Sequence, residues 1–431
     1  MLAIENSLLV VIDIQDRLVR VMHEKEALLG NLQKIIKGAG ILNIPMIVTE
    51  QDPEKLGTTI PEIQAYSVHV PDDILRFHRV LPGYAPTPLI SLDGIAGDLG
   101  VGRLMVKDEG RRFGLKAFKA LGASYAVYRV LHERSGGCLE PEEFVGEKGR
   151  QLANGITLSC ATDGNHGRAV AWIAGLLGRP AVIYVPRGTV PARIDAIQSE
   201  GARVVVVDGG YDDTVRYAAK EGEGSRLIIA DIAYPGYTKI PRYIQQGYLT
   251  IFREVSEQLE DKGEGPPDIV FIQAGVGAFA SAAAMFFNNP SDGVRLVCAE
   301  PQAADCLFRS VKAGDGVPHS VSSGKSTIMA GLNCETPSLT AWPAVRDRFD
   351  AFVSIEDRWA REAMRCLAAE GVVSGESGAA GLAALIAFCK ERPGFPGERL
   401  HLLDNARILV INTEADTDPG AYRRIVGFQG S

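Results

Sequence analysis

Short apolar runs that end in a polar residue or a glycine recur along the whole chain. Nine such runs have the length and composition of buried strands and predict strands within residues 8–14, 44–50, 103–109, 180–186, 202–208, 226–231, 268–275, 294–300 and 407–414. Between them lie segments with helical spacing that stop at glycine, among them residues 164–178, 191–201 and 211–222. This alternation predicts an α/β protein with mainly parallel sheets, in which ligands gather at the carboxyl ends of the strands.

Composition and charge narrow the class of protein. The chain has 431 residues, 46% of them hydrophobic, which is enough for two or three domains with large cores. A net charge of −8 and the lack of a long Lys/Arg run argue against a nucleic acid or a membrane surface as partner. Seven scattered cysteines without a CxxC pair predict reduced thiols in a cytoplasm and no metal site. Asp13 interrupts the first apolar run, so neither a signal peptide nor a membrane span is expected there.

The most conspicuous strand exit is DIVFIQAGVGAFASAAAMFF, which starts at residue 268. The predicted strand stops at Ala274, and a helix of small residues begins after Gly275, Val276 and Gly277. The free backbone N–H groups at such a helix start can hold a phosphate. The same spacing fits a dinucleotide fingerprint with Ala280 in the last place and Glu300 as the ribose-binding acid, so a nicotinamide oxidoreductase is an alternative.

A second candidate site is the loop of residues 162–167, between a strand-like run and a helix. Thr162, Asp163, Gly164, Asn165 and His166 form a polar stretch whose backbone donors could hold a small carboxylate. A dinucleotide enzyme does not require this loop. The structural alternatives are that Asn165 and Asp163 cap the following helix and that His166 is a packed loop histidine.

Four segments together resemble a known family. AFKALG (117–122), DGNHG (163–167), GVGAFA (275–280) and INTEADTD (411–418) follow one another as in pyridoxal-phosphate enzymes of fold type II, the tryptophan synthase β-like class. Within that class, residues 106–126, 161–172, 234–248, 327–337 and 373–382 resemble the diaminopropionate ammonia-lyase family, and the match extends from about Phe77 to Phe428. The resemblance implies two parallel-sheet α/β domains with the cofactor between them.

The resemblance implies roles for single residues. Lys119 matches the lysine that binds the aldehyde of pyridoxal 5'-phosphate, which needs a partly desolvated amine, whereas Lys116 is expected to be solvated or accessory. Asn165 matches the ligand of the phenolic oxygen, and the loop around it would hold the substrate carboxylate. The turn from Gly275 through Ala278 to Phe279 matches the phosphate site. Thr413 matches the residue that faces the pyridine nitrogen, where a neutral hydroxyl would leave that nitrogen largely unprotonated and suited to elimination.

Two acidic residues distinguish the chain from serine and threonine dehydratases of the same fold, which are the second alternative. Those relatives carry a small residue where this chain has Asp163, and Asp231 matches another acidic position of the ammonia-lyases. A β-ammonium group needs a carboxylate partner and a Cα proton needs a base, roles that the two aspartates and Lys119 can share. The resemblance implies elimination of 2,3-diaminopropionate, in D and L forms, to pyruvate and two ammonia by a homodimer. Glu376 and Ser377 match a further pocket motif, unless they cap a helix.

Residues 1–65 lie outside this match. SLLVVIDIQDRL (7–18) and IPMIVTEQDPEKLGTTIPEI (44–63) resemble the first strand, helix and second strand of an isochorismatase-like hydrolase, with Asp13 at its catalytic acid. The lysine and cysteine that this family needs do not follow, so an inactive βαβ fragment is expected, with a hydrolase or binding module as the alternative. The predicted domains are this fragment, a large cofactor-binding domain of residues 70–122 and 241–431, and a small domain of residues 123–240. Seams are predicted at residues 65–73 and 260–268.

Overall fold

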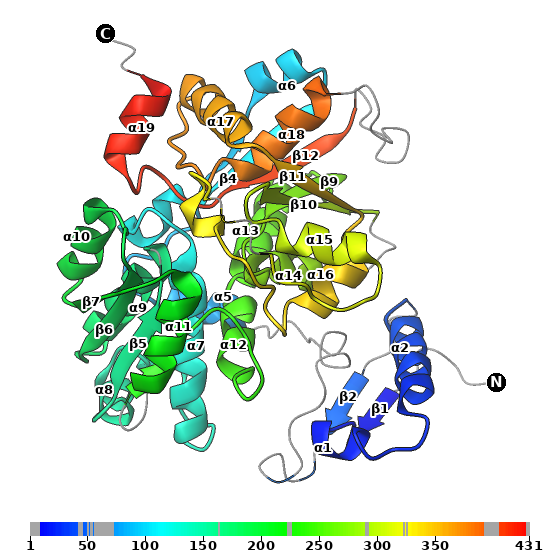
Figure 1. The fold of residues 1–431 in the computed structure, drawn as a ribbon, viewed down its shortest axis with the longest axis vertical. Helices are drawn as coiled ribbons and strands as arrows, with labels where there is room; N and C mark the ends of the chain where they lie inside the picture. The colour runs from blue at the N-terminus through cyan, green and yellow to red at the C-terminus, as the bar shows by residue number, and fades with distance from the viewer. Residues whose placement is uncertain are drawn as a thin grey trace.

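The computed structural model describes residues 9–41, 46–49, 51, 55, 73–162, 164–221, 226–288, 293–321, 324, 326–391 and 405–427 (Figure 1). Asp163 and residues 65–72 of the first predicted seam lie outside these ranges. The strands are β1 Leu9–Ile12, β2 Met46–Thr49, β3 Leu89–Ser91, β4 Arg103–Asp108, β5 Thr157–Ala161, β6 Ala181–Pro186, β7 Arg203–Val207, β8 Arg226–Ile228, β9 Ile269–Gln273, β10 Arg295–Pro301, β11 Ala351–Ile355 and β12 Arg407–Asn412. Each of the nine predicted runs therefore contains a strand.

The helices follow the strands in alternation, as predicted. The α-helices are α1 Asp16–Val19, α2 Lys25–Ile41, α5 Asp73–Arg79, α6 Asp93–Leu99, α7 Lys119–Arg134, α8 Glu147–Leu152, α9 Asn165–Leu176, α10 Pro191–Ser199, α11 Tyr211–Glu221, α12 Lys239–Gly247, α13 Leu249–Glu260, α14 Ala278–Phe286, α15 Cys306–Ala313, α16 Trp342–Arg348, α17 Asp357–Ala369, α18 Ala380–Lys390 and α19 Pro419–Val426. Short 3₁₀ turns are η2 Glu109–Gly114, η3 Pro141–Glu143 and η5 Ala330–Leu332.

The larger sheet has six strands in the order β11-β10-β9-β12-β4-β3, all parallel except β3. Successive side chains of a strand point to opposite faces, and both faces of this sheet are apolar. In β9, Val270 and Ile272 pack on the side of α13 and α14, whereas Ile269 and Phe271 pack on the side of α17 and α18. Helices therefore cover both faces, which confirms the predicted α/β class with parallel sheets.

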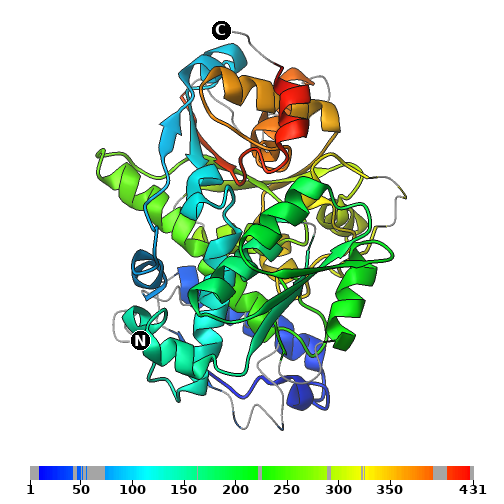
Figure 2. The same ribbon diagram turned by 90° about the vertical axis from the view of Figure 1, so that its left-hand side faces the viewer.

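The smaller sheet has four parallel strands in the order β7-β6-β5-β8. Ile183 and Val185 of β6 pack with α9, and Tyr184 between them packs on the opposite face beside Ala218 of α11. Figure 2 shows this sheet and its helices, in green, toward the viewer, with α19, in red, above them. In a parallel sheet the carboxyl ends of all strands lie at the same edge. The loops that follow the strands of each sheet can therefore line a ligand site.

Helix α7 packs closely against α12. A Cβ atom at Gly247 would lie 2.5 Å from the carbonyl oxygen of Leu121, and one at Gly122 would lie 2.6 Å from the ring of Tyr248. Only glycine permits this approach of the two backbones. The first turn of α7, which carries Lys119, is therefore held directly against the backbone of α12.

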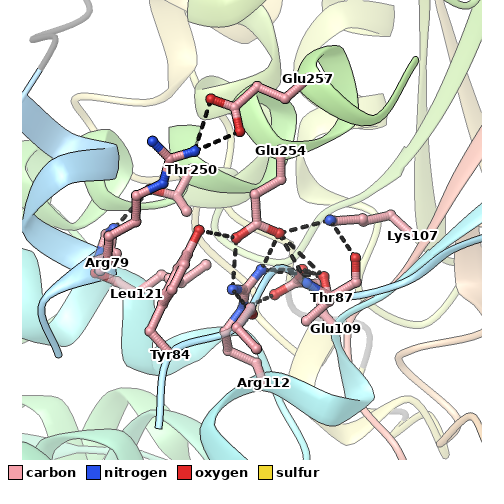
Figure 3. Close-up of polar contacts among 12 residues, drawn as sticks. Arg79, Tyr84, Thr87, Lys107, Glu109, Arg112, Leu121, Thr250, Glu254 and Glu257 are labelled. Atoms are coloured by element: carbon pink, nitrogen blue, oxygen red, sulfur yellow. Dashed lines mark hydrogen bonds and ion pairs between the residues drawn. The ribbon is translucent and has the colours of Figure 1, made fainter. Parts of the chain in front are cut away.

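A buried ionic cluster lies at the junction of β4, η2 and α13 (Figure 3). The side chains of Lys107, Glu109, Arg112 and Glu254 have no exposed surface. Glu254 accepts hydrogen bonds from Lys107 at 2.7 Å and from both terminal nitrogens of Arg112 at 2.8 Å. Arg112 also binds Glu109 at 2.7 Å, and Tyr84 donates to Glu254 at 2.8 Å. Two cations thus face two anions, which is the condition for stable burial of charge.

The N-terminal segment forms a two-stranded parallel sheet, β1-β2, with α1 and α2 between the strands. Val11 of β1 packs with Val19 and Ile36, whereas its neighbours Val10 and Ile12 are 43% and 62% exposed. One face of β1 is thus buried under helices and the other carries exposed apolar side chains.

Candidate active site

Residues at the carboxyl ends of strands from both sheets, together with the start of α7, line one cavity. The lining residues are Phe118, Lys119, Ala161, Thr162, Asn165, His166, Asp231, Gln273, Gly275, Val276, Gly277, Ala278, Phe279, Gly331, Leu332, Cys334, Ser377, Thr413 and Glu414. The predicted site residues that the structure describes are among them, except Gly164 and Glu376. Gly164 lines a neighbouring cavity with Lys116 and Asp416. Asp163 lies outside the described residues.

Lys119 begins α7, and its Nζ donates a hydrogen bond of 2.7 Å to Oδ2 of Asp231. The two side chains are 19% and 9% exposed. Burial alone would raise the pKa of the Asp231 carboxyl, but the charge and hydrogen bond of Lys119, the nearby His166 ring and a backbone hydrogen bond together outweigh burial and hold that pKa below its usual range. The lysine nitrogen also lies 5.3 Å from the centre of the Phe118 ring. The predicted reactive amine is therefore partly desolvated and paired with a carboxylate.

The loop before α9 holds its polar groups in different ways. His166 is 4% exposed, and its Nε2 lies 2.7 Å from the carbonyl oxygen of Ile229. Because a carbonyl only accepts, Nε2 carries the hydrogen, and burial lowers the pKa of the ring so that the neutral form is favoured. Its Nδ1 is buried and has no hydrogen-bond partner within the described residues. Thr162 Oγ1 accepts the backbone N–H groups of Gly164 at 3.0 Å and Gly167 at 3.1 Å.

The capping role considered for Asn165 is wrong, because its side chain turns toward the other sheet. Its Nδ2 donates a short hydrogen bond to Oε2 of Glu414, which follows β12 and is 2% exposed. Glu414 also accepts the backbone N–H of Ser377 at 3.2 Å. Glu414 was not among the predicted site residues, although it is the last residue of the predicted strand segment 407–414, just as Asp231 is the last residue of segment 226–231.

The turn after β9 has the geometry of an anion site. Gly277 precedes α14 with φ +93°, a backbone conformation that side chains other than glycine rarely adopt. A Cβ at Gly275 would lie 3.1 Å from Cys334 Sγ, so glycine lets this turn pack closely against Cys334 while it lines the cavity. The first N–H groups of a helix have no intrahelical partner and carry partial positive charge, which favours a phosphate.

The ribose-binding role considered for Glu300 is also wrong. Glu300 is fully buried and accepts the backbone N–H groups of Leu307 at 2.9 Å and Phe308 at 2.6 Å, at the start of α15. Burial raises the pKa of this carboxyl to about 8. A buried carboxyl that caps a helix is not available to bind a ribose. The dinucleotide fingerprint therefore lacks its acidic residue, which argues against the nicotinamide oxidoreductase alternative.

Gln273 is a second cavity residue that the sequence analysis missed. It ends β9 and is 2% exposed. Its Nε2 lies 2.8 Å from the carbonyl oxygen of Ile411 and 3.0 Å from Oγ1 of Thr413. The carbonyl oxygens of Gly378 and Ser377 lie at 3.1 and 3.3 Å from the same nitrogen. Thr413 itself is 4% exposed and lines the cavity.

The remaining candidates lie at the edge of the site. Lys116 pairs with Asp416 at 2.8 Å and is 44% exposed, away from the cavity that holds Lys119. Ser377 does line the cavity, and its Oγ accepts the backbone N–H of Gly331 at 3.0 Å. Ala379 occupies the cap position of α18, so the capping alternative for Ser377 is wrong. Glu376 is buried, which raises the pKa of its carboxyl.

Three further features bear on ligands, partners and cellular compartment. Within the described residues, no group of three or more His, Cys, Asp or Glu side chains is placed to hold a metal ion. In that same part of the chain, every helix falls short of the length and apolar character needed to cross a membrane. The seven cysteines all lie within the described residues, and they form no disulfide there.

Comparison with known proteins places this site in a family. The family model described as "Pyridoxal-phosphate dependent enzyme" matches residues 80–414. The diaminopropionate ammonia-lyase of Escherichia coli K12 is 40% identical over 361 residues, which cover 81% of this chain and 89% of that protein. The Salmonella typhimurium protein of the same name is 38% identical over 371 residues, 83% of this chain and 92% of that one. The crystal structure of the E. coli lyase in complex with an aminoacrylate-PLP azomethine reaction intermediate covers 82% of this chain and 90% of its own, with a TM-score of 0.74 and 40% identity.

Proposed function

Since this chain belongs to the pyridoxal-phosphate-dependent enzymes and, among them, to the diaminopropionate ammonia-lyases, we propose that it eliminates ammonia from 2,3-diaminopropionate. One substrate molecule and one water give pyruvate and two ammonia. The enzyme is thus a carbon–nitrogen lyase with pyridoxal 5'-phosphate as cofactor. The observation that carries this proposal is that the Lys119 amine and the open glycine turn of residues 275–277 line the same cavity.

The residues of this cavity fit pyridoxal phosphate. The turn Gly275–Phe279 at the positive end of α14 suits the phosphate, and the partly desolvated Lys119 amine suits the aldehyde. Asn165 and Thr413, from the two different sheets, suit the phenolic oxygen and the pyridine nitrogen. Glu414 supports this assignment for Asn165. Because the Glu414 carboxylate accepts one hydrogen of the Asn165 amide, the amide NH₂ group and not the amide oxygen faces Glu414.

When bound, pyridoxal phosphate withdraws electrons from the substrate Cα and so makes its proton easier to remove. Lys119 Nζ donates a hydrogen bond of 2.7 Å to Asp231 Oδ2, and this pair can take up a proton or return one within the cavity. The backbone N–H groups of Thr162, Gly164 and Gly167 are bound within the protein, so we assign those of Asn165 and His166, at the start of α9, to the substrate carboxylate. We assign Asp163 to the β-ammonium group or to the Cα proton, because its carboxylate belongs to the same loop.

An activity assay with matched substrates tests the proposal. Purified protein should show a visible absorption band that borohydride bleaches, and it should form pyruvate from D- and L-2,3-diaminopropionate. Pyruvate from serine but from neither diaminopropionate enantiomer would instead indicate the dehydratase alternative. A protein without bound pyridoxal phosphate that cannot be reconstituted with it would contradict the cofactor itself.

For the N-terminal residues 1–65 we propose an isochorismatase-like fragment without catalytic activity. The parallel pairing of β1 with β2 across α2 supports the resemblance, and the matched family region begins only at residue 80. Asp13 lies just beyond β1 with φ +53°, in a tight turn between strand and helix. A two-stranded sheet is too small to enclose a site of its own, which supports a fragment over a working hydrolase.

We also propose that the enzyme acts in the cytoplasm as a homodimer, with a large domain of residues 70–122 and 241–431 and a small domain of residues 123–240. The lack of a disulfide among the seven cysteines, all of which the structure describes, supports a reducing compartment. The strands of the six-stranded sheet all fall within the limits given for the large domain, and those of the four-stranded sheet within the small one. Size-exclusion chromatography with light scattering tests the dimer.

A further inference from the structure

Thr413 offers a hydroxyl group to the cavity, and a hydroxyl can either donate or accept a hydrogen bond. The direction matters for a pyridine nitrogen placed against it. An unprotonated nitrogen accepts from the hydroxyl, whereas a protonated nitrogen donates to it. Threonine alone therefore does not determine the protonation state of the ring.

The orientation of the Gln273 amide is determined by its surroundings. Three backbone carbonyl oxygens, of Ile411, Gly378 and Ser377, lie 2.8 to 3.3 Å from its Nε2. Carbonyl oxygens only accept hydrogen bonds, so the amide nitrogen must face them. Exchange of the two amide ends would place Oε1 against the same three oxygens, which is repulsive.

This orientation in turn fixes the Thr413 hydroxyl. An amide nitrogen has no free lone pair, so Thr413 Oγ1, 3.0 Å from Gln273 Nε2, can only accept there. Its single hydrogen must point elsewhere. The described residues offer Oγ1 no other hydrogen-bond partner, and the residue lines the cavity. The hydrogen is thus available to a group inside the cavity.

We propose that Gln273 is a positioning residue that makes the Thr413 hydroxyl a donor toward the pyridine nitrogen and thereby keeps that nitrogen unprotonated. The inference rests on the proposed function, because the place of Thr413 opposite the nitrogen comes from the family resemblance. An unprotonated ring withdraws electrons less strongly, which suits elimination better than transamination. Gln273 therefore contributes to reaction specificity without contact to the reacting atoms.

The test is the nitrogen signal of holoenzyme reconstituted with pyridoxal phosphate that carries ¹⁵N in the ring. Wild-type enzyme should give the position of an unprotonated pyridine, unchanged across the neutral pH range. Gln273→Met removes the amide but keeps an unbranched side chain, so the hydroxyl can turn. The signal should then move toward the pyridinium position and become pH-dependent. Gln245→Met is the matched control, because Gln245 is also buried and donates to a threonine hydroxyl, Thr340 Oγ1 at 2.8 Å, outside this cavity.

A protonated nitrogen in the wild-type enzyme would overturn the inference, as would a Gln273→Met signal identical to that of Gln245→Met. If Gln273→Met does not retain the cofactor, the wild-type enzyme in D₂O decides. For a nitrogen at the unprotonated position, a deuterium isotope shift supports a hydroxyl donor, and its absence refutes both that donor and the role proposed for Gln273. Failure of the proposed function is separate, since it would appear as missing cofactor or missing pyruvate in the wild-type protein.

Discussion

Glu254→Gln should destabilise the fold strongly, because the carboxylate lies at the centre of the buried ionic cluster of Lys107, Glu109, Arg112 and Glu254. The substitution keeps the size of the side chain but removes its charge. Two buried cations then face one anion, Glu109, which remains paired with Arg112 at 2.7 Å. Lys107 loses its contact of 2.7 Å with a carboxylate and becomes the uncompensated charge.

The size of the destabilisation depends on the hydrogen bonds that Lys107 retains. Loss of one partner of a buried ion pair costs about 3–5 kcal/mol, a large part of the roughly 5–15 kcal/mol that stabilises a typical domain. Lys107 still donates to the carbonyl oxygen of Thr87 at 2.7 Å and to Gln258 Oε1 at 2.9 Å, so we expect the lower end, about 3 kcal/mol. Burial already lowers the pKa of Lys107, and without Glu254 that pKa falls further. The unfolded chain then binds more protons than the folded one, so the loss should shrink as pH rises toward the unfolded lysine pKa of about 10.4.

Urea unfolding followed by far-UV circular dichroism measures the difference in free energy of unfolding. Glu257→Gln is the matched control: it lies one turn further along α13, and its ion pair with Arg79 at 2.8 Å joins side chains that are 52% and 43% exposed. Such a pair contributes at most about 1 kcal/mol. Equal unfolding midpoints for the two variants would refute the reasoning, and so would a loss that grows with pH.

Three further changes test the site and the N-terminal segment. Lys119→Ala should abolish the borohydride-reducible bond to pyridoxal phosphate while Lys116→Ala retains it, and a pyridoxyl label mapped to Lys116 would reverse the assignment. Asp163→Asn should keep the cofactor but lower pyruvate formation from at least one diaminopropionate enantiomer by about 10²-fold or more, with serine enantiomers assayed in parallel; unchanged rates on both would reduce Asp163 to a loop residue. Deletion of residues 1–64 should leave lyase activity largely intact, because every residue of the proposed site lies beyond them, and an insoluble product would show instead that the segment covers an apolar surface.

Much of the fold and of the site could be predicted, because the ligand-binding residues of parallel sheets lie at the carboxyl ends of the strands. Each predicted run became a strand, and Lys119, Asp231 and the turn of residues 275–279 meet in one cavity. Strands β3 and β11 were not predicted. Strand β3 has only three residues, which is too short to stand out as an apolar run. Strand β11 is mostly half-buried, so it is not a long apolar run either. The same strand-end rule misled at Glu300, where the start of the next helix binds the carboxylate instead of a ligand.

The roles of Gln273 and Glu414 could not be assigned from the sequence, because they depend on contacts between distant parts of the chain, although the strand-end position of Glu414 marks it as a candidate. Gln273 meets Thr413 across 140 positions, and Asn165 meets Glu414 across 249. Hydrophobic periodicity predicts where strands form, but it does not indicate which strands lie next to one another in the sheet. The order β9-β12-β4 brings Gln273 beside Thr413, and that order follows from the packing of the whole domain.

The close contact of α7 with α12 limits how this enzyme can be altered. Because Gly122 and Gly247 leave no room for a Cβ, any side chain at either position would push the two helices apart and displace Lys119. Mutational libraries that aim at new substrates should therefore keep both glycines and the cofactor residue Asn165 constant, and vary other positions of the loop of residues 162–167, which follows β5 of the smaller sheet. The attachment point of the cofactor and the surface that selects the substrate can then diverge independently during laboratory evolution.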